Sequence, residues 1–216
     1  MLEQGCMSSV EVIDGRIFKT INKVNVEGTV IPLYEEYKIL KYVQNLGPEF
    51  PQNVRCEGPL ALSYDYKPGV TLESYLKNNQ ASFKLQKNLA FQFIMIYCKL
   101  MNKCIYHEDF NYRNFIIDDN NMLHIIDFGM MDIYGRNKIG IDQRNLPKGV
   151  NFDNYPEPPE DYRDVDFYQS DNEKFDHIKS KIRYNLTHIK GLIKDVDIVK
   201  QLNNSKSLQE VINILS

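Results

Sequence analysis

The chain has 216 residues, with 43% hydrophobic and 25% charged residues, which is the composition of an ordinary globular protein and gives no reason to expect disorder. The net charge of −3 and the scattering of Lys and Arg along the chain are not typical of nucleic-acid binding. Because the four cysteines form no Cys-x-x-Cys pair and no apolar run is long enough to span a bilayer, we expect a soluble cytoplasmic protein with reduced thiols and neither a membrane nor a nucleic-acid partner.

The first third of the chain is predicted to form a small antiparallel sheet with one helix. Valines alternate with polar residues up to Asp14-Gly15, a pair that strongly indicates a hairpin, and apolar residues resume after it. After Pro32, the segment LYEEYKILKYVQNLG has apolar residues at helical spacing and ends in a glycine, so we expect a helix there. PLALSYDY is predicted to be a buried strand that ends at the break over residues 67–69.

From Thr71 onward the pattern becomes mainly helical. TLESYL begins a short helix, and LQKNLAFQFIMIYCKLMNK is predicted to be the long helix at the centre of a second core. FII and MLHII, separated by the turn residues DDNN, are expected to pair as a second hairpin. A loop over residues 127–160, a helix from about 172 to 193 and a last helix from about 208 to 215 complete the predicted elements.

Three polar residues are predicted to meet at one end of this second hairpin. Asp109 precedes its first strand, Asn114 enters that strand, and Asp127 follows its second strand. Two carboxylates and an amide oxygen suit Mg²⁺, which keeps several waters and is completed by substrate phosphates. Asp and Asn are also common turn residues, so these three residues alone indicate either a magnesium site or an ordinary turn.

The spacing of these residues resembles the catalytic loop of the protein-kinase family. HEDFNYRN, from His107 to Asn114, has the form HxDxxxxN, and the DFG sequence that starts at Asp127 follows it by one hairpin. Neither motif is specific alone, but the two together in this order are. PPE over residues 158–160 is similar to the APE motif that closes the activation segment of the family.

The resemblance implies the α+β, bilobal fold of the protein kinases in a single domain. The N-terminal lobe, a small antiparallel sheet with one helix, would cover residues 1–66, and residues 67–69 would form the hinge. A mainly helical and shortened C-terminal lobe would cover residues 70–216.

The N-terminal lobe has counterparts of the ATP-binding motifs of this family. LEQGCMSSV resembles a degenerate glycine-rich loop, RIFK is similar to VAIK, and Glu36 matches the helix glutamate that would pair with Lys19, with Glu35 as the alternative. Backbone groups of Asp65 and Lys67 would bind adenine at the hinge. The residues implied to bind ATP are Gly5, Val10, Lys19, Glu36, Asp65, Tyr66 and Lys67.

The resemblance also implies roles in catalysis. Asp109 would act as the base toward the acceptor hydroxyl, Lys19 would hold the phosphates, and Asn114 and Asp127 would hold Mg²⁺. Arg113 is predicted to act on the transferred phosphate, because Asn111 stands where serine/threonine kinases usually have a lysine. The alternative for Arg113 is an outward orientation or a pair with a nearby acid.

Two departures from the family concern regulation. Glu108 replaces the arginine of the HRD motif, and the segment over residues 127–160 contains no Ser or Thr. Control by Ser/Thr phosphorylation of this segment is therefore not expected. Constitutive activity and gating by a regulatory partner protein both stay open.

The implied function is that of a protein kinase that uses ATP and Mg²⁺ on a protein substrate, with Ser/Thr acceptors favoured and Tyr left open. Small atypical kinases of the RIO type also lack the catalytic-loop lysine. A small-molecule kinase of the aminoglycoside or choline type is one alternative, because such enzymes share HxDxxxxN. A pseudokinase that serves as an interaction module is another, because Glu3 and Ser8 replace glycines of the loop.

Overall fold

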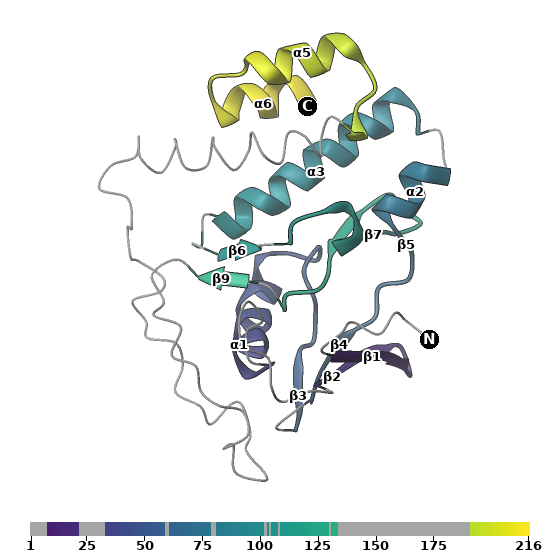
Figure 1. Cartoon of the computed structure of the whole chain (residues 1–216), viewed down its shortest axis with the longest axis vertical. Coiled ribbons are helices and arrows are strands. Elements are labelled where there is room, and N and C mark those ends of the chain that lie inside the picture. Colours follow the sequence, from purple (N-terminus) through teal and green to yellow (C-terminus); the bar gives the residue numbers. More distant parts are fainter. Residues whose placement is uncertain are drawn as a thin grey trace, which may run out of the picture.

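The computed structural model arranges the chain in two parts, which Figure 1 shows one above the other. The N-terminal lobe contains one sheet and helix α1, and the C-terminal lobe is built around the long helix α3. Predictions for Gly5, Glu108, the PPE sequence and most of the helix over 172–193 lie outside the described residues. The structure describes residues 8–21, 33–58, 61–78, 81–101, 103, 105–107, 109–129, 131–133 and 191–216.

The N-terminal sheet begins with the predicted hairpin. Asp14 and Gly15 form its turn with φ values of 48° and 74°, as a tight two-residue hairpin turn requires. The described strands pair in the order β1-β2-β4-β3, all antiparallel, and β3 was not predicted because RCEG has no apolar alternation. The strands are β1 (Ser8–Ile13), β2 (Arg16–Ile21), β3 (Arg55–Gly58) and β4 (Ala61–Asp65).

Helix α1 (Leu33–Val43) forms where the apolar periodicity predicted it. Tyr37, Leu40 and Val43 are buried on one face of the helix, and a short 3₁₀ turn, η1 (Gln44–Leu46), follows before Gly47. The apolar face of α1 is therefore fixed in the core, and the orientation of its remaining side chains is fixed with it.

Four described helices form most of the C-terminal lobe. Thr71 caps the first of them as predicted, since its hydroxyl accepts a hydrogen bond from the Ser74 N–H at 3.2 Å. Helix α5 was missed, although Asp195 caps it by accepting from the N–H groups of Asp197 and Ile198. No helix in the described part of the chain combines the length and apolarity needed to cross a bilayer. The helices are α2 (Leu72–Asn78), α3 (Phe83–Met101), α5 (Val196–Asn204) and α6 (Leu208–Leu215).

Short strands hold the catalytic-loop region. The predicted second hairpin is confirmed, with Phe115 opposite Ile125 in an antiparallel pair. Its first strand also pairs with β5, and β6 pairs with β9 in a separate ladder. The strands are β5 (Val70–Thr71), β6 (Ile105–His107), β7 (Phe115–Ile117), β8 (Leu123–Ile125) and β9 (Met131–Ile133), and the 3₁₀ turn η2 (Tyr112–Asn114) precedes β7.

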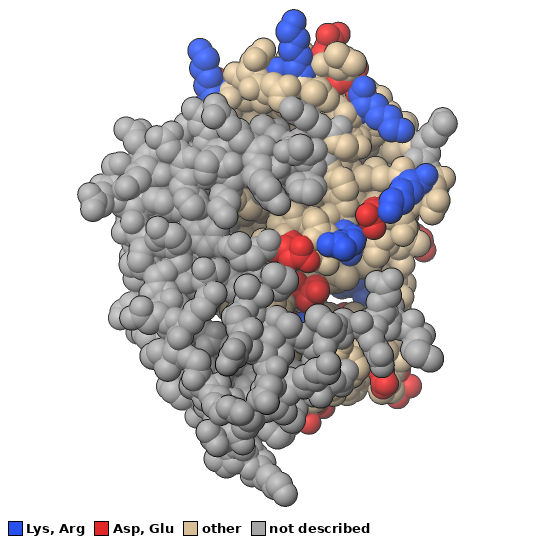
Figure 2. Space-filling model, in the orientation of Figure 1, with Lys and Arg blue, Asp and Glu red and all other residues tan. Residues whose placement is uncertain are grey.

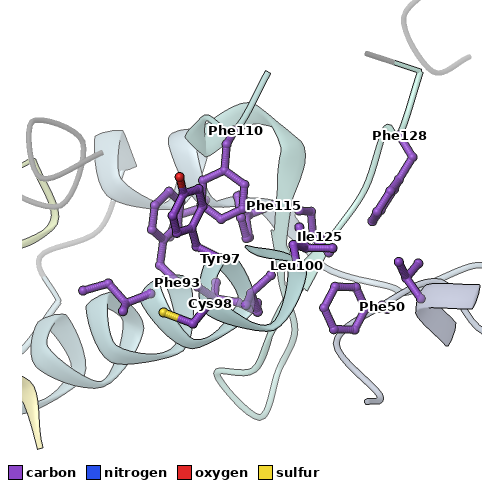
Figure 3. Packing of buried hydrophobic residues seen from close by; sticks show 14 of the residues in the cluster. Phe50, Phe93, Tyr97, Cys98, Leu100, Phe110, Phe115, Ile125 and Phe128 are labelled. Carbon is purple, nitrogen blue, oxygen red and sulfur yellow. The ribbon is translucent and has the colours of Figure 1, made fainter. Parts of the chain in front are cut away.

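A cluster of aromatic rings joins α3 to the catalytic loop (Figure 3). The ring of Phe110 lies 4.6 Å from that of Phe93, 5.1 Å from that of Tyr97 and 4.9 Å from that of Phe115, measured between centroids. Phe110 directly follows Asp109, so the packing of its ring fixes the backbone beside that carboxylate.

The segment after α1, residues 47–53, contacts both lobes. Its Glu49 carbonyl accepts from the Ile125 N–H at 2.9 Å, and its Pro48 carbonyl lies 3.2 Å from Nδ1 of His124. Lys99 of α3 forms an ion pair with the buried Glu49 carboxylate. On the other side, the Gln52 carbonyl accepts from a strand β4 N–H, so one short segment links the two lobes.

Candidate active site

Three charged residues from separate elements meet between the lobes. Lys19 lies on β2, Glu36 on α1, and Asp127 just after β8. Lys19 Nζ is 2.8 Å from Glu36 Oε1 and 3.2 Å from Asp127 Oδ1. The predicted Lys19–Glu36 pair is therefore present, and the lysine also reaches the acid of the DFG sequence.

Burial and charge set the protonation of this cluster. Burial disfavours the Lys19 ammonium, but Glu36 and Asp127 outweigh it, so the pKa of Lys19 lies above its usual value. Burial would raise the pKa of Asp127, but Lys19 outweighs it and the pKa lies below the usual value. Burial raises the pKa of Glu36, and Lys19 opposes that rise. Lys19 and Asp127 are therefore both charged at neutral pH.

The backbone at Asp127 has an uncommon conformation. Its φ of 59° lies in the left-handed region, which costs a non-glycine residue about 1 kcal/mol. The next side chain, Phe128, is buried, and its ring centroid lies 5.3 Å from that of His107. This backbone turn places the Phe128 ring in the core while 56% of the Asp127 side chain stays exposed.

Asp109 is held by two amides. The side-chain nitrogen of Asn114 donates to Asp109 Oδ2 at 2.8 Å, and that of Asn111 donates to Asp109 Oδ1 at 2.5 Å. The hairpin also brings Asn114 close to the strand before Asp127, because the Asn114 carbonyl accepts from the Ile126 N–H at 2.8 Å. Asp109 and Asn114 therefore meet as predicted. The hairpin brings the residue before Asp127 to Asn114, whereas among the described residues no hydrogen bond joins Asp127 itself to either of them.

The comparison with family models agrees with this geometry. The model described as "Protein tyrosine and serine/threonine kinase" matches residues 17–150, more than half of the chain. The chain belongs to this kinase family. The resemblance inferred from the motifs and the α+β kinase-like fold are confirmed, whereas the likeness to RIO-type kinases and the shortening of the C-terminal lobe stay predictions. A comparison with curated protein sequences gave no match.

Two N–H groups at the predicted hinge are used within the N-terminal lobe. The Asp65 N–H donates to the Gln52 carbonyl, and the Tyr66 N–H donates to the Gly15 carbonyl, both at 3.0 Å. Within the described residues, no hydrogen bond involves the Lys67 N–H. That backbone groups of Asp65 and Lys67 bind adenine stays a prediction.

Gly69 ends the hinge in a conformation that requires glycine. Its φ is 155°, and a Cβ at this position would clash with the carbonyl oxygen of Ile117 on β7. The chain therefore passes directly over β7 as it enters the C-terminal lobe. Val10, the other predicted nucleotide contact in the described part, lies on β1 opposite Lys19 and is half-buried.

Arg113 is exposed and is connected to Asp109 only indirectly. Its Nε donates to Asn111 Oδ1 at 3.4 Å, and its backbone N–H donates to the same oxygen at 2.9 Å. The sequence pointed to the transferred phosphate, to an outward orientation or to a nearby acid such as Asp118. The exposure of Arg113 agrees with the outward orientation, and the contact with Asn111 was not anticipated. A role of Arg113 in catalysis stays a prediction.

The predicted metal ligands are suited to a cation whose coordination is completed by the phosphates of a substrate. Among the described residues, no hydrogen bond involves Asn114 Oδ1 or Asp127 Oδ2, whereas the Asn114 amide nitrogen is used by Asp109. The described part of the chain also has no group of three or more His, Cys, Asp or Glu residues that could enclose a metal ion. One carboxylate and one amide oxygen fit Mg²⁺, which commonly keeps waters and binds substrate phosphates.

Charged side chains of both signs lie on the described part of the surface in view. Figure 2 shows Lys and Arg side chains among Asp and Glu side chains on this face. The contacts that sequence reasoning missed are those of Asn111 with Asp109, of Lys19 with Asp127 and of Gly129 with Lys19. The DFG motif contains Asp127 and Gly129 but does not indicate that either lies against Lys19.

Proposed function

We propose that this member of the kinase family transfers the γ-phosphate of ATP to a Ser or Thr hydroxyl of a protein substrate, with Tyr as the alternative acceptor. The observation that carries the proposal is the different environment of the two acids. Asp127 is paired with the ammonium of Lys19, whereas Asp109 is held by neutral amides. Asp127 is thus suited to bind the metal that holds the phosphates, and Asp109 is suited to accept a proton.

The chain's residues divide the work of phosphoryl transfer between them. Lys19, fixed by Glu36, binds the phosphates, and Asn114 and Asp127 offer oxygens to Mg²⁺. Bound ATP with Mg²⁺ supplies the phosphoryl group and neutralises the charge that develops on it. Asp109, partly exposed and oriented by two donors, accepts the proton of the acceptor hydroxyl.

A protein substrate is supported by the family match. The matching model describes kinases of tyrosine and of serine/threonine and therefore leaves the acceptor residue open. Neither Asn111 nor Arg113 follows the serine/threonine pattern, because serine/threonine kinases usually have a lysine at the first position and tyrosine kinases have an arginine at the second. We favour Ser/Thr on the overall resemblance of the motifs.

The test is a transfer assay with labelled ATP, Mg²⁺ and a panel of proteins, alongside calorimetric binding of ATP with Mg²⁺. The Asp127→Ala variant should lose metal-dependent nucleotide binding. The Asp109→Asn variant should bind ATP nearly as the wild type does but transfer phosphate at least about a hundredfold more slowly, the usual contribution of a positioned base.

Other outcomes would identify the alternatives. Transfer to small hydroxyl compounds but to no protein would indicate a small-molecule kinase. Nucleotide binding without any transfer, or no binding at all, would indicate a pseudokinase. Equal loss of ATP affinity in both variants would contradict the separate roles of the two acids.

A further inference from the structure

Asp109 is held by a donor that the motif does not contain. Asn111 Nδ2 donates to Asp109 Oδ1 at 2.5 Å and to the Asp109 carbonyl oxygen at 3.2 Å. Asn114 Nδ2 makes the corresponding pair of bonds to Asp109 Oδ2 and to the same carbonyl, at 2.8 and 2.7 Å. Each carboxylate oxygen therefore receives one amide N–H, and the carboxylate is held from both sides.

The amide of Asn111 is itself fixed by the turn that follows. Asn111 is the N-cap of η2 with extended backbone angles, φ −135° and ψ 167°, and its Oδ1 accepts from the N–H and the Nε of Arg113. Its backbone N–H donates to the Asp109 carbonyl, and its own carbonyl accepts from the Asn114 N–H. Since Oδ1 faces only donors, Nδ2 must face Asp109, and the amide has one satisfactory orientation.

We propose that Asn111 is a positioning residue for the catalytic base, an inference that rests on the proposed function. A carboxylate with a donor on one oxygen only can rotate about its Cβ–Cγ bond, whereas a donor on each oxygen fixes its plane. Each oxygen still has lone-pair capacity for the proton of an acceptor hydroxyl. A neutral amide also fixes the carboxylate without forming an ion pair with it, which a lysine at this position could do.

The same contacts assign an indirect role to Arg113. Its guanidinium reaches Asn111 and not Asp109, so it acts on the base by holding the Asn111 amide. Replacing Arg113 after Asn111 has been removed should then have little further effect. A guanidinium that acted directly on the transferred phosphate would instead contribute independently of Asn111.

The activity test compares Asn111→Ala, Asn111→Ser, Arg113→Ala and the double Ala variant. Asn111→Ala should lower kcat by about 10- to 100-fold and leave KM for ATP within about twofold, because only the placement of the base changes. Asn111→Ser, which keeps one of the two hydrogen-bonding functions, should recover part of kcat. The double variant should be no slower than Asn111→Ala within about twofold.

The exposed Asn120 in the turn between β7 and β8 provides the matched control. Asn120→Ala should leave kcat and KM at wild-type values, and the melting temperatures of Asn120→Ala and Asn111→Ala should both lie above the assay temperature, which shows that both variants are folded. Wild-type kcat in Asn111→Ala, or a change confined to KM for ATP, would overturn the proposal. A loss of kcat in the double variant equal to the product of the losses in the two single variants would overturn the indirect role of Arg113.

A second readout does not need turnover. In NMR spectra of the full chain, the side-chain amide of Asn111 is identified by its loss in Asn111→Ala. Its proton shifts should move and its exchange with water should speed up in Asp109→Ala. If the wild type transfers no phosphate, the proposed function fails while this measurement still decides the contact. An Asn111 amide that is unaffected by Asp109→Ala would overturn the positioning role.

Discussion

Gly129 lies directly against the ammonium of Lys19. A Cβ at Gly129 would be 3.1 Å from Lys19 Nζ, 3.4 Å from Asp127 Oδ1 and 3.7 Å from Glu36 Oε2. The backbone here does not have the positive φ that would require glycine. The glycine of the DFG sequence is therefore needed for space beside three charged groups.

Gly129→Ala should weaken binding of ATP with Mg²⁺ about tenfold, because Lys19 Nζ must move by a few tenths of an ångström from its position between two carboxylates. Calorimetric titration measures this. Gly191→Ala is the matched control, since its Cβ would lie equally close, 3.1 Å, to a neutral atom, the hydroxyl oxygen of Tyr112. Equal affinities for Gly129→Ala and the wild type would show that the ammonium moves freely.

Phe110→Ala should lower the free energy of unfolding by about 3–5 kcal/mol, since it removes a buried ring from the aromatic cluster. Phe110→Leu keeps most of the volume and should cost less than about 1.5 kcal/mol. Denaturant titration of both variants measures the difference. Similar losses of unfolding free energy in Phe110→Ala and Phe110→Leu would mean that the cavity left by the smaller side chain is not the cause of the destabilisation.

Lys99→Met should lower the free energy of unfolding by about 1–2 kcal/mol, because the Glu49 side chain, only 11% exposed, loses its cationic partner. The estimate is modest because 39% of the Lys99 side chain is exposed to solvent. Adding Glu49→Gln should recover part of the loss, since no unpaired charge then remains buried. A double-mutant cycle, with free energies of unfolding from denaturant titration, gives the coupling free energy between Lys99 and Glu49. Strictly additive losses would argue against the ion pair.

His107 should make the fold sensitive to mild acid. Burial lowers the pKa of His107 below its usual 6.5, so the unfolded chain binds this proton more readily than the folded chain does. The contribution of neutral His107 to the free energy of unfolding is fully present above pH 6.5. It is lost as the pH falls through 6.5 toward the lower pKa of the folded chain. Denaturation at a series of pH values should show a flatter dependence for His107→Phe between about pH 7 and 5. An unchanged slope would mean that His107 binds its proton equally well in the folded and the unfolded chain.

Much of the fold followed from local patterns. The turn at Asp14-Gly15 and the apolar faces of α1 and α3 appear in the structure where periodicity and turn chemistry predicted them. Strands β5, β6 and β9 were not predicted, because two or three residues carry no period and their pairing depends on distant partners. Helix α5 was missed because its cap, Asp195, was not recognised as a helix start.

In the site, too, some contacts follow from sequence motifs and others depend on how distant parts of the chain pack. Motif order was enough to predict that Lys19 meets Glu36, 17 residues away, and that Asp109 and Asn114 lie together. The contact of Lys19 with Asp127, across 108 residues, and the space at Gly129 depend on how the lobes pack. The contact of Asn111 with Asp109 depends on the extended angles of one residue, which the motif does not specify.

The segment after α1 has a mechanical consequence. Its Glu49 carbonyl is bonded to the Ile125 amide of the C-terminal lobe, and its Gln52 carbonyl to the Asp65 amide of the N-terminal sheet. Only Phe50, which is 1% exposed, and Pro51, whose ring fixes one of its backbone angles, lie between these two attachments. The lobes therefore have few rotatable bonds here about which to open, and this segment acts as a stiff pivot. Large opening movements would have to break one of the two hydrogen bonds, and the corresponding amide would then exchange its hydrogen with water.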